Sequence, residues 1–204
     1  MRVSTLKAWG LFTCLLITHS VAAAPATKSQ MEQGEAPFGD GYEQSLQSKK
    51  YFNKGNRAYS KAIELIKDGK TGAAEKELRN AEKELRKSAK ADQKNLAAFS
   101  LLGKVYARLG ESRKSVGAFN YALQLNPKHY DSWLERAKVL LEMGLRSEVK
   151  QSFNVLERSA PNMAESLLKA IITFKEQRTA IMSTEEVAFF EWAEAVSYTH
   201  LTLP

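Results

Sequence analysis

Between residues 96 and 127, apolar residues recur at steps of three and four, the spacing of one face of an α-helix. Two stripes follow each other: Phe99, Leu102, Tyr106 and Leu109, then Val116, Phe119, Ala122 and Leu123. Gly110 lies between them, where a residue with positive φ closes a helix at low cost. Pro127 ends the second stripe by forcing Asn126 out of helical geometry. The pattern predicts a helical hairpin, with Gly103 and Ala122 small enough to let its helices approach closely.

The same pattern recurs 34 residues later, when residues 96–129 are laid on residues 130–163. Six identities result: Lys104 on Lys138, Val105 on Val139, Gly110 on Gly144, Phe119 on Phe153, Asn120 on Asn154, and Pro127 on Pro161. Phe99 and Trp133 coincide as aromatic residues. Each hairpin leaves apolar surface that only a neighbouring hairpin can cover, so the units are expected to stack.

These units resemble the tetratricopeptide (TPR) family. The first carries the family's residues at the family's spacing: Phe99, Leu102, Gly103, Tyr106, Leu109, Gly110, Phe119, Ala122 and Pro127. The second keeps Trp133, Ala137, Gly144, Phe153 and Pro161, and departs from the family at Arg136, Leu140, Val149 and Leu156. The resemblance implies an all-α, TPR-like helix-turn-helix solenoid of about three hairpins. It is firm over residues 96–129 and 130–163 and looser over the wider region 47–195.

Weaker units flank the two firm repeats. Residues 51–59 resemble a first helix whose turn is delayed to Gly69, followed by a charged helix from Thr71 to Lys90. The second of these helices has a narrow apolar seam: Ala74, Leu78, Ala81 and Leu85. Downstream, a helix from Met163 to Gln177 precedes a capping box at residues 183–186 and another helix. That last pair is either a further full repeat with a lengthened turn or the cap of the solenoid.

The N-terminal pattern predicts export. A short basic region precedes an apolar core at residues 8–18, and Val21-Ala22-Ala23 offers the small residues that a signal peptidase needs. We therefore expect a signal peptide over residues 1–23, a flexible linker over 24–46, and a periplasmic or secreted protein. The alternative is an uncleaved N-terminus that places a scaffold at a membrane. Cys14 is the only cysteine, so the mature protein would contain neither disulfides nor thiols.

The last nine residues, VSYTHLTLP, differ from the Lys-, Glu-, Ala- and Leu-rich chain before them. Reverse translation reproduces one reading frame of a widely used transposase sequencing adapter. Residues 196–204 are therefore predicted to be an adapter scar rather than part of the natural protein. On this interpretation the reading frame was cut at Ala195, and the sequence is a truncated fragment.

The chemistry that the residues offer points away from catalysis. His129 is the one histidine outside the predicted signal and scar, and the sequence has no metal-ligand spacing, nucleophile–base set or phosphate-binding loop. We expect no enzyme activity, cofactor, metal or small-molecule substrate. The net charge is +7, but acidic residues alternate with basic ones, as in residues 75–86, so nucleic acid is not an expected partner.

The resemblance instead implies a protein or peptide partner, because the first helices of TPR hairpins line a concave groove. The groove positions carried over are Phe52, Asn56, Tyr59, Ser100, Lys104, Arg108, Asp131, Leu134, Lys138 and Leu141. Some members of the family bind chaperone tails through a clamp that requires particular residues at several positions, and here only Asn56 meets that requirement. Recognition of a terminal carboxylate by that clamp is therefore not expected. The sequence favours a non-enzymatic adaptor or scaffold of the cell envelope or secretory pathway. The alternative is the N-terminal interaction module of a larger, C-terminally truncated enzyme.

Overall fold

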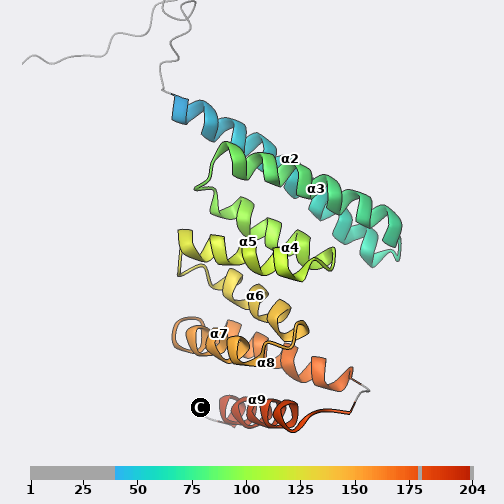
Figure 1. Ribbon diagram of the computed structural model, residues 1–204, viewed down its shortest axis with the longest axis vertical. Helices are drawn as coiled ribbons and strands as arrows, with labels where there is room; N and C mark the ends of the chain where they lie inside the picture. The colour runs from blue at the N-terminus through green and yellow to red at the C-terminus, as the bar shows by residue number, and fades with distance from the viewer. Residues whose placement is uncertain (1–39, 179–180, 203–204) are drawn as a thin grey trace, which may run out of the picture. The chain divides into compact units, whose positions relative to one another are not determined.

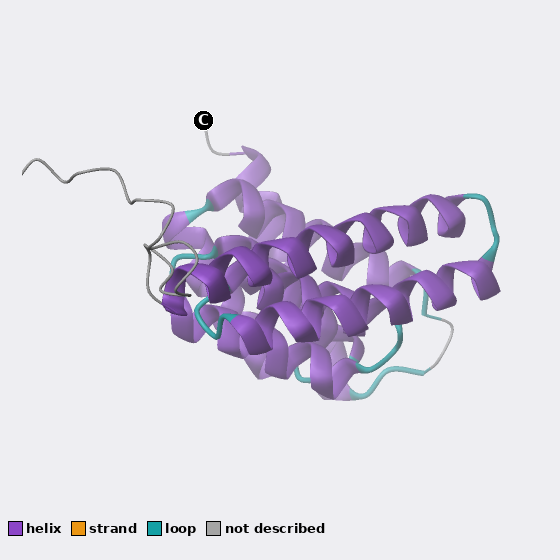
Figure 2. Cartoon of the chain, turned by 90° about the horizontal axis from the view of Figure 1, so that it is seen from above, coloured by secondary structure: helices purple, strands orange, loops and turns teal. Residues whose placement is uncertain are grey.

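The computed structural model describes residues 40–178 and 181–202, and within these ranges it contains eight α-helices and no strand (Figures 1 and 2). The helices are α2 (Asp40–Lys67), α3 (Thr71–Ala91), α4 (Leu96–Arg108), α5 (Ser112–Leu125), α6 (Tyr130–Glu142), α7 (Arg146–Ser159), α8 (Pro161–Glu176) and α9 (Thr184–Thr202). None of the described helices is both long enough and apolar enough to cross a membrane. The predicted signal peptide and residues 24–39 of the predicted linker lie outside the described residues.

Successive helices pair into hairpins, and successive hairpins stack in chain order (Figure 1). The pairs are α2 with α3, α4 with α5, α6 with α7, and α8 with α9. First helices also touch across hairpins, α2 with α4, α4 with α6, and α6 with α8. The predicted all-α, TPR-like solenoid is thus confirmed, with four helix pairs in the described residues where about three were expected.

Three of the turns are closed by glycines with positive φ: Gly69 at 72°, Gly110 at 72° and Gly144 at 77°. After α4, the amide of Gly110 donates to the carbonyl of Ala107 at 3.1 Å, and that of Glu111 donates to Tyr106 at 2.9 Å. This pair of hydrogen bonds satisfies the last carbonyls of the helix. The predicted turn at Gly110 and the delayed turn at Gly69 are both confirmed.

The apolar side chains form two core clusters. The first joins α2, α3 and α4, and includes Leu78, Ala81 and Leu85 of the predicted seam. The second joins α6, α7, α8 and α9, with Phe153 and Phe190 among its largest members. All four residues of the predicted seam on α3 are buried. The burial of these faces against neighbouring hairpins stabilises the stack.

Two of the aromatic residues expected in the core are only half-buried. The ring of Phe99 lies 4.1 Å from that of Tyr121, centroid to centroid, at the side of the first repeat. The indole Nε1 of Trp133 donates to the carbonyl of Pro127 at 2.9 Å. An indole N–H needs a polar partner, which this turn supplies at the edge of the core. By contrast, Phe119 and Phe153 are buried as expected.

The ends of the helical region differ from the expected boundaries. α2 begins at Asp40, so residues 40–46 are helical and not part of a flexible linker. The buried hydroxyl of Ser48 bonds the carbonyl of Ser88 at 3.0 Å, and α2 extends about two turns before that contact. At the other end, α9 continues past Ala195 to Thr202. The adapter origin of residues 196–204 stays a prediction.

The predicted capping box before α9 is confirmed. The amide of Ser183 donates to Oε2 of Glu186 at 3.0 Å, and the amide of Glu186 donates to Oγ of Ser183 at 3.2 Å. The two residues thus satisfy donors that the first turn of a helix leaves without partners. Arg146 of α7 and Arg178, which follows α8, both pair with the same Glu186 carboxylate. The start of α9 is therefore fixed to two neighbouring helices.

Candidate peptide-binding groove

A cleft of about 470 Å³ opens between the first helices of three successive hairpins. Its lining comes from α2, α4 and α6: Tyr59, Lys104, Ala107, Arg108, Glu135, Lys138, Val139 and Glu142. Lys104 and Arg108 are four residues apart on α4, so they project from the same side of that helix. Glu135, Lys138 and Glu142 follow each other at steps of three and four, so they lie on one side of α6. The stacking of the hairpins brings these two sides together.

Four of the ten predicted groove residues line this cleft: Tyr59, Lys104, Arg108 and Lys138. They come from three different helices, and the positions carried over from the TPR resemblance selected them. Phe52 and Asn56 lie one to two turns before Tyr59 on α2, where Phe52 packs partly against the first core cluster and Asn56 is exposed. Asp131 is exposed in the first turn of α6. For these seven residues, contact with a ligand stays a prediction.

The other three predicted groove residues are buried: Ser100, Leu134 and Leu141. The hydroxyl of Ser100 accepts a hydrogen bond from Ser132 of α6 at 3.2 Å, which holds the neighbouring first helices together. Leu134 and Leu141 belong to the second core cluster. The expectation that these side chains face an open groove is therefore corrected. The close approach of α4 and α6 places them at helix contacts.

The charges in the cleft are only partly neutralised by one another. Nζ of Lys138 pairs with Oε1 of Glu135 at 2.9 Å, and both side chains are about one third exposed. Across residues 40–178 and 181–202, Lys104 and Arg108 take part in no ion pair, and neither does Glu142. Two cations and one carboxylate are thus open to a ligand, and the cleft offers a local excess of positive charge.

A second hollow, of about 340 Å³, adjoins the cleft at Arg108. Its other lining residues are mostly apolar and come from α2, α3 and the end of α4, with Ile66, Leu78 and Leu109 among them. Arg108 therefore stands between a charged cleft and a hollow that is lined by four apolar residues together with Thr71 and Glu75. An extended chain that crosses both could place an acidic side chain near Lys104 and Arg108 and an apolar one near Ile66.

Four lining residues were not predicted from the sequence: Ala107, Glu135, Val139 and Glu142. The repeat alignment contains a signal for two of them, because Glu142 stands 34 residues after Arg108 and Ala107 stands 34 residues before Leu141. A residue that stands 34 positions from a predicted groove residue could therefore have been predicted from the sequence. Val139 has no such marker, because its counterpart Val105 was not a predicted groove residue and an apolar residue on a helix is the usual sign of packing.

Histidine and acidic side chains elsewhere in the stack serve local structure. Nδ1 of His129, in the turn before α6, lies 2.8 Å from the hydroxyl of Ser132. Glu148 receives the hydroxyl of Ser147 at 2.6 Å, and that hydrogen bond is the main reason that its pKa lies below the usual value. In the part of the chain that the structure describes, no three His, Cys, Asp or Glu side chains are grouped so that they could hold a metal ion.

No protein-family model matches this chain, and no curated protein matches it by sequence. Solved structures of helical proteins are similar to it in part. One is the Yersinia enterocolitica type III secretion chaperone SycD in complex with a peptide of the translocator YopD. Its sequence is 19% identical, the match covers 69% of this chain and 92% of SycD, and the TM-score is 0.41.

Another similar structure is MamA of AMB-1, with 16% identity, coverage of 74% of this chain and 99% of MamA, and a TM-score of 0.44. At identities and TM-scores this low, neither likeness assigns a function to this chain. The cleft must be interpreted from its own residues.

Proposed function

We propose that this protein is a non-enzymatic adaptor that binds a segment of another protein in the cleft between α2, α4 and α6. One observation carries the proposal. The TPR resemblance selected Tyr59, Lys104, Arg108 and Lys138 as binding positions, and these four side chains line one cleft of about 470 Å³. A cleft of that size accommodates a few side chains of an extended peptide.

The chemistry of the cleft favours a segment with an acidic side chain. Lys104 and Arg108 have no carboxylate partner among the described residues, so a ligand carboxylate can pair with them without displacing an existing ion pair. Hydrogen bonds between charged groups are worth about 1.5–3 kcal/mol when water is excluded, and less at exposed sites. Arg108 is exposed and Lys104 is half-buried, so each of their contacts with a ligand should be worth less than about 1.5 kcal/mol. Glu142 and Glu135 would repel a second carboxylate on the α6 side.

The proposed site of action is the cell envelope or the space outside the cell. The support for this part of the proposal is the sequence pattern of residues 1–23, a basic start followed by an apolar core and a small-residue cleavage site. Mass spectrometry of the protein recovered from its native host would test it. A mature N-terminus near Ala24 is the expected result, and an intact Met1 in the cytoplasm would contradict export.

The groove itself can be tested with a display library of random peptides selected on the immobilised protein. Enriched peptides are then measured by fluorescence anisotropy against the double variant Lys104→Glu with Arg108→Glu. We expect at least about tenfold weaker binding, because two attractive contacts become repulsive. The matched control is Arg113→Glu with Lys128→Glu, which makes the same charge change at exposed positions outside the cleft.

The control variant is expected to bind within about threefold of the unmodified protein, since exposed and distant charges are screened by salt. Equal binding by the groove variant and the control would show that the peptides bind elsewhere. The proposal would then be wrong, whatever the affinity of the peptides.

A further inference from the structure

The positive charge of the described helices is concentrated in the first hairpin. Residues 40–95, which hold α2, α3 and the turn after them, contain 14 Lys and Arg against 9 Asp and Glu. Residues 96–202 contain 13 against 12. The first hairpin thus carries a net charge of +5, and the three hairpins after it carry +1 together. A difference of this size along one stack produces a strongly basic end.

Three of the four carboxylates of α3 are turned inward, although they alternate with basic residues in the sequence, and only that of Glu75 is exposed. The side chains of Glu77, Glu82 and Glu84 are 18%, 13% and 19% exposed. Glu77 pairs with Lys61 of α2 at 2.7 Å, and its pKa is lowered mainly by that hydrogen bond. Glu84 pairs with Lys87 at 2.7 Å. These three acids are therefore neutralised close to the body of the hairpin. Glu43, Glu64 and Glu75 are exposed, but they are outnumbered by the exposed cations of the hairpin.

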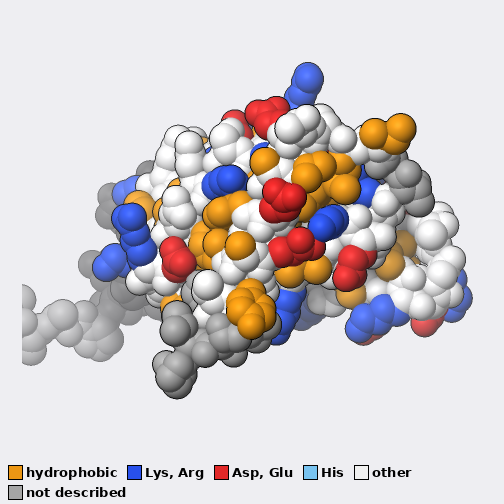
Figure 3. All heavy atoms as spheres, turned by 90° about the horizontal axis from the view of Figure 1, so that it is seen from below, with side chains coloured by type: hydrophobic (Ala, Val, Ile, Leu, Met, Phe, Trp, Pro, Cys, Tyr) orange, Lys and Arg blue, Asp and Glu red, His pale blue; other side chains and the backbone are white. Residues whose placement is uncertain are grey.

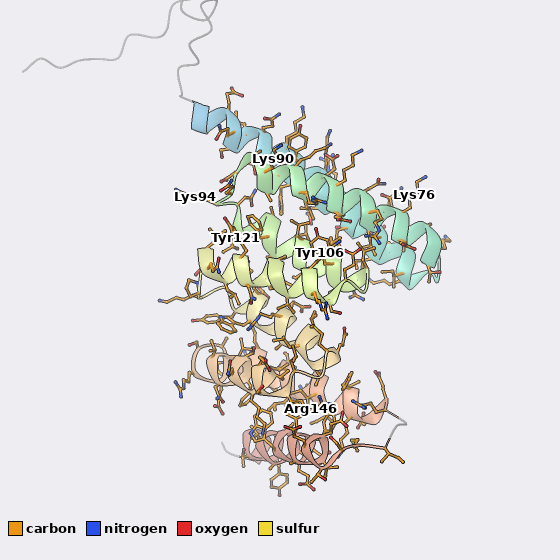
Figure 4. The ribbon with its side chains drawn as sticks, in the orientation of Figure 1. Lys76, Lys90, Lys94, Tyr106, Tyr121 and Arg146 are labelled. Carbon is orange, nitrogen blue, oxygen red and sulfur yellow. The ribbon has the colours of Figure 1, made fainter. Side chains whose placement is uncertain are left out.

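Nine cations of this hairpin are exposed and form no ion pair with any described residue. They are Lys49, Lys50, Lys54, Arg57, Lys67, Lys76, Lys83, Lys90 and Lys94. Eight of the nine are lysines. Figure 4 shows two of them, Lys76 and Lys90, toward opposite ends of α3. The unpaired charges are therefore spread along the hairpin and not gathered at one point.

Helical spacing places many of these cations on two neighbouring stripes. Lys50, Lys54 and Arg57 follow each other at steps of four and three on α2, opposite the buried face of that helix. Lys76, Lys83 and Lys90 follow at steps of seven on α3, opposite the buried residues of its seam.

The two stripes flank one seam between α2 and α3. That seam is marked by the Lys61–Glu77 ion pair and by Nζ of Lys87, 5.3 Å from the centroid of the Tyr51 ring. Each contact lies within about two helical turns of cations on both stripes. We call the six cations of the two stripes the basic face.

We propose that the basic face docks the protein on an anionic phospholipid surface. A helix of 28 residues is about 40 Å long, so the hairpin can lie along a membrane and engage several headgroups at once. Lysines act as point charges near a negatively charged leaflet, and such segments bind without inserting apolar side chains. Arg57 is the only arginine among the six cations, and the aromatic ring at the seam, Tyr51, is half-buried beneath Nζ of Lys87, which leaves little of it for a nucleobase to stack on. These features favour a lipid surface over nucleic acid.

The opposite end of the stack, at α9, is not predominantly basic. Figure 3 views the molecule from that end, and there basic and acidic side chains are mixed with apolar ones. The basic face also lies on residues that do not line the cleft, so this inference is independent of the proposed groove. A protein bound to a membrane through α2 and α3 would leave Lys104 and Arg108 free for a partner.

The test is co-sedimentation of the full chain with vesicles of phosphatidylcholine alone or of phosphatidylcholine with added phosphatidylglycerol. We expect stronger binding to the anionic vesicles and loss of that difference at high salt, because screening weakens exposed charges. The variant Lys54→Glu, Lys83→Glu, Lys90→Glu should bind anionic vesicles at least about tenfold more weakly. The apolar stretch at residues 8–18 is the same in every variant, so the comparison isolates the charges.

The matched control is Arg113→Glu, Lys128→Glu, Arg158→Glu, the same charge change at exposed positions of later hairpins. It should bind within about threefold of the unmodified protein. Circular dichroism verifies that both variants remain helical. Equal binding to neutral and anionic vesicles, equal losses in the two variants, or tighter binding to duplex DNA than to anionic vesicles at equal phosphate would each overturn the proposal. The groove variant Lys104→Glu with Arg108→Glu should retain vesicle binding, which separates this test from that of the groove.

Discussion

The ring of Phe119 lies directly against the backbone of Gly103. A Cβ added at Gly103 would come within 2.6 Å of the ring carbon Cε1, closer than such contacts occur in folded proteins. The first hairpin repeats this arrangement, since a Cβ at Gly55 would lie 2.6 Å from Cγ of Leu85. Each of these hairpins is thus packed so closely that one helix must lack a side chain.

We predict that Gly103→Ala destabilises the protein. Overpacking of this kind costs about 1–3 kcal/mol, and the better helix propensity of alanine returns up to about 1 kcal/mol of it. Urea denaturation measures the net effect on the free energy of unfolding. Gly117→Ala is the control, because Gly117 lies inside α5 with nothing within 4 Å of an added Cβ. That change should be neutral or stabilising, and a loss of equal size in both variants would contradict the packing explanation.

Truncation of Phe99 and Phe119, the two phenylalanines of the first repeat, should have unequal effects. Phe119 is fully buried, so Phe119→Ala leaves a cavity and should cost about 3–5 kcal/mol. Phe99 is half-buried and contacts mainly Tyr121, so Phe99→Ala should cost clearly less, about 1–2 kcal/mol. Thermal and urea unfolding of the two variants measure the difference. Equal losses would mean that Phe99 is held in the core more tightly than its exposure indicates.

Asn95 joins the first hairpin to the second, and its two functions can be separated. Its Oδ1 accepts from the amide of Ala98 at 3.0 Å as the N-cap of α4, while Nδ2 donates to the buried Ser48 hydroxyl at 2.9 Å. Asn95→Ala loses both and should cost about 1–2 kcal/mol. Asn95→Asp keeps the cap acceptor but not the donor, so it should fall between the alanine variant and the unmodified protein. If Asn95→Asp is as stable as the unmodified protein, the hydrogen bond from Asn95 to Ser48 contributes nothing to the free energy of unfolding.

The attachment of α9 should weaken in acid. The backbone amide of Ser183 is the largest cause of the lowered pKa of Glu186, followed by the nearby charges of Arg146 and Arg178. A carboxyl whose pKa is lower in the folded state than in the unfolded state stabilises the fold above the unfolded pKa. That contribution disappears as pH falls through the folded value.

Glu186→Gln should therefore destabilise the protein at neutral pH, and the difference from the unmodified protein should shrink as the pH falls through the lowered pKa of Glu186. Unfolding followed at several pH values tests this. A difference that stays constant with pH would show that the glutamine acts through shape and not through lost charge.

Much of the fold could be predicted from the sequence because each hairpin is specified locally. Apolar residues at steps of three and four from Phe99 to Leu109, followed by a glycine, predict a helix and its end without any knowledge of distant contacts. The boundary at Asp40 could not be predicted in this way. α2 is extended by packing against α3, through contacts such as Ser48 with Ser88, which are 40 residues apart.

The candidate groove was predictable only in part. The register between repeats located Lys104 and Lys138, but the distance between α4 and α6 decides which neighbours remain open. Ser100 became buried because Ser132 approaches it across that contact. Likewise, the alternating charges of residues 75–86 concealed that Glu77 and Glu84 turn inward. The inward position of these two carboxylates depends on their ion-pair partners, Lys61 and Lys87, and Lys61 lies on the other helix of the hairpin.

The division of the core into two clusters, one around Leu85 and the other around Phe153, has a consequence for how the molecule comes apart. Because neither cluster spans all eight described helices, we expect heat or denaturant to melt one half of the stack while the other persists. Amide hydrogen exchange should then show two protection levels along the chain, and the weaker half would be the first that a protease cuts.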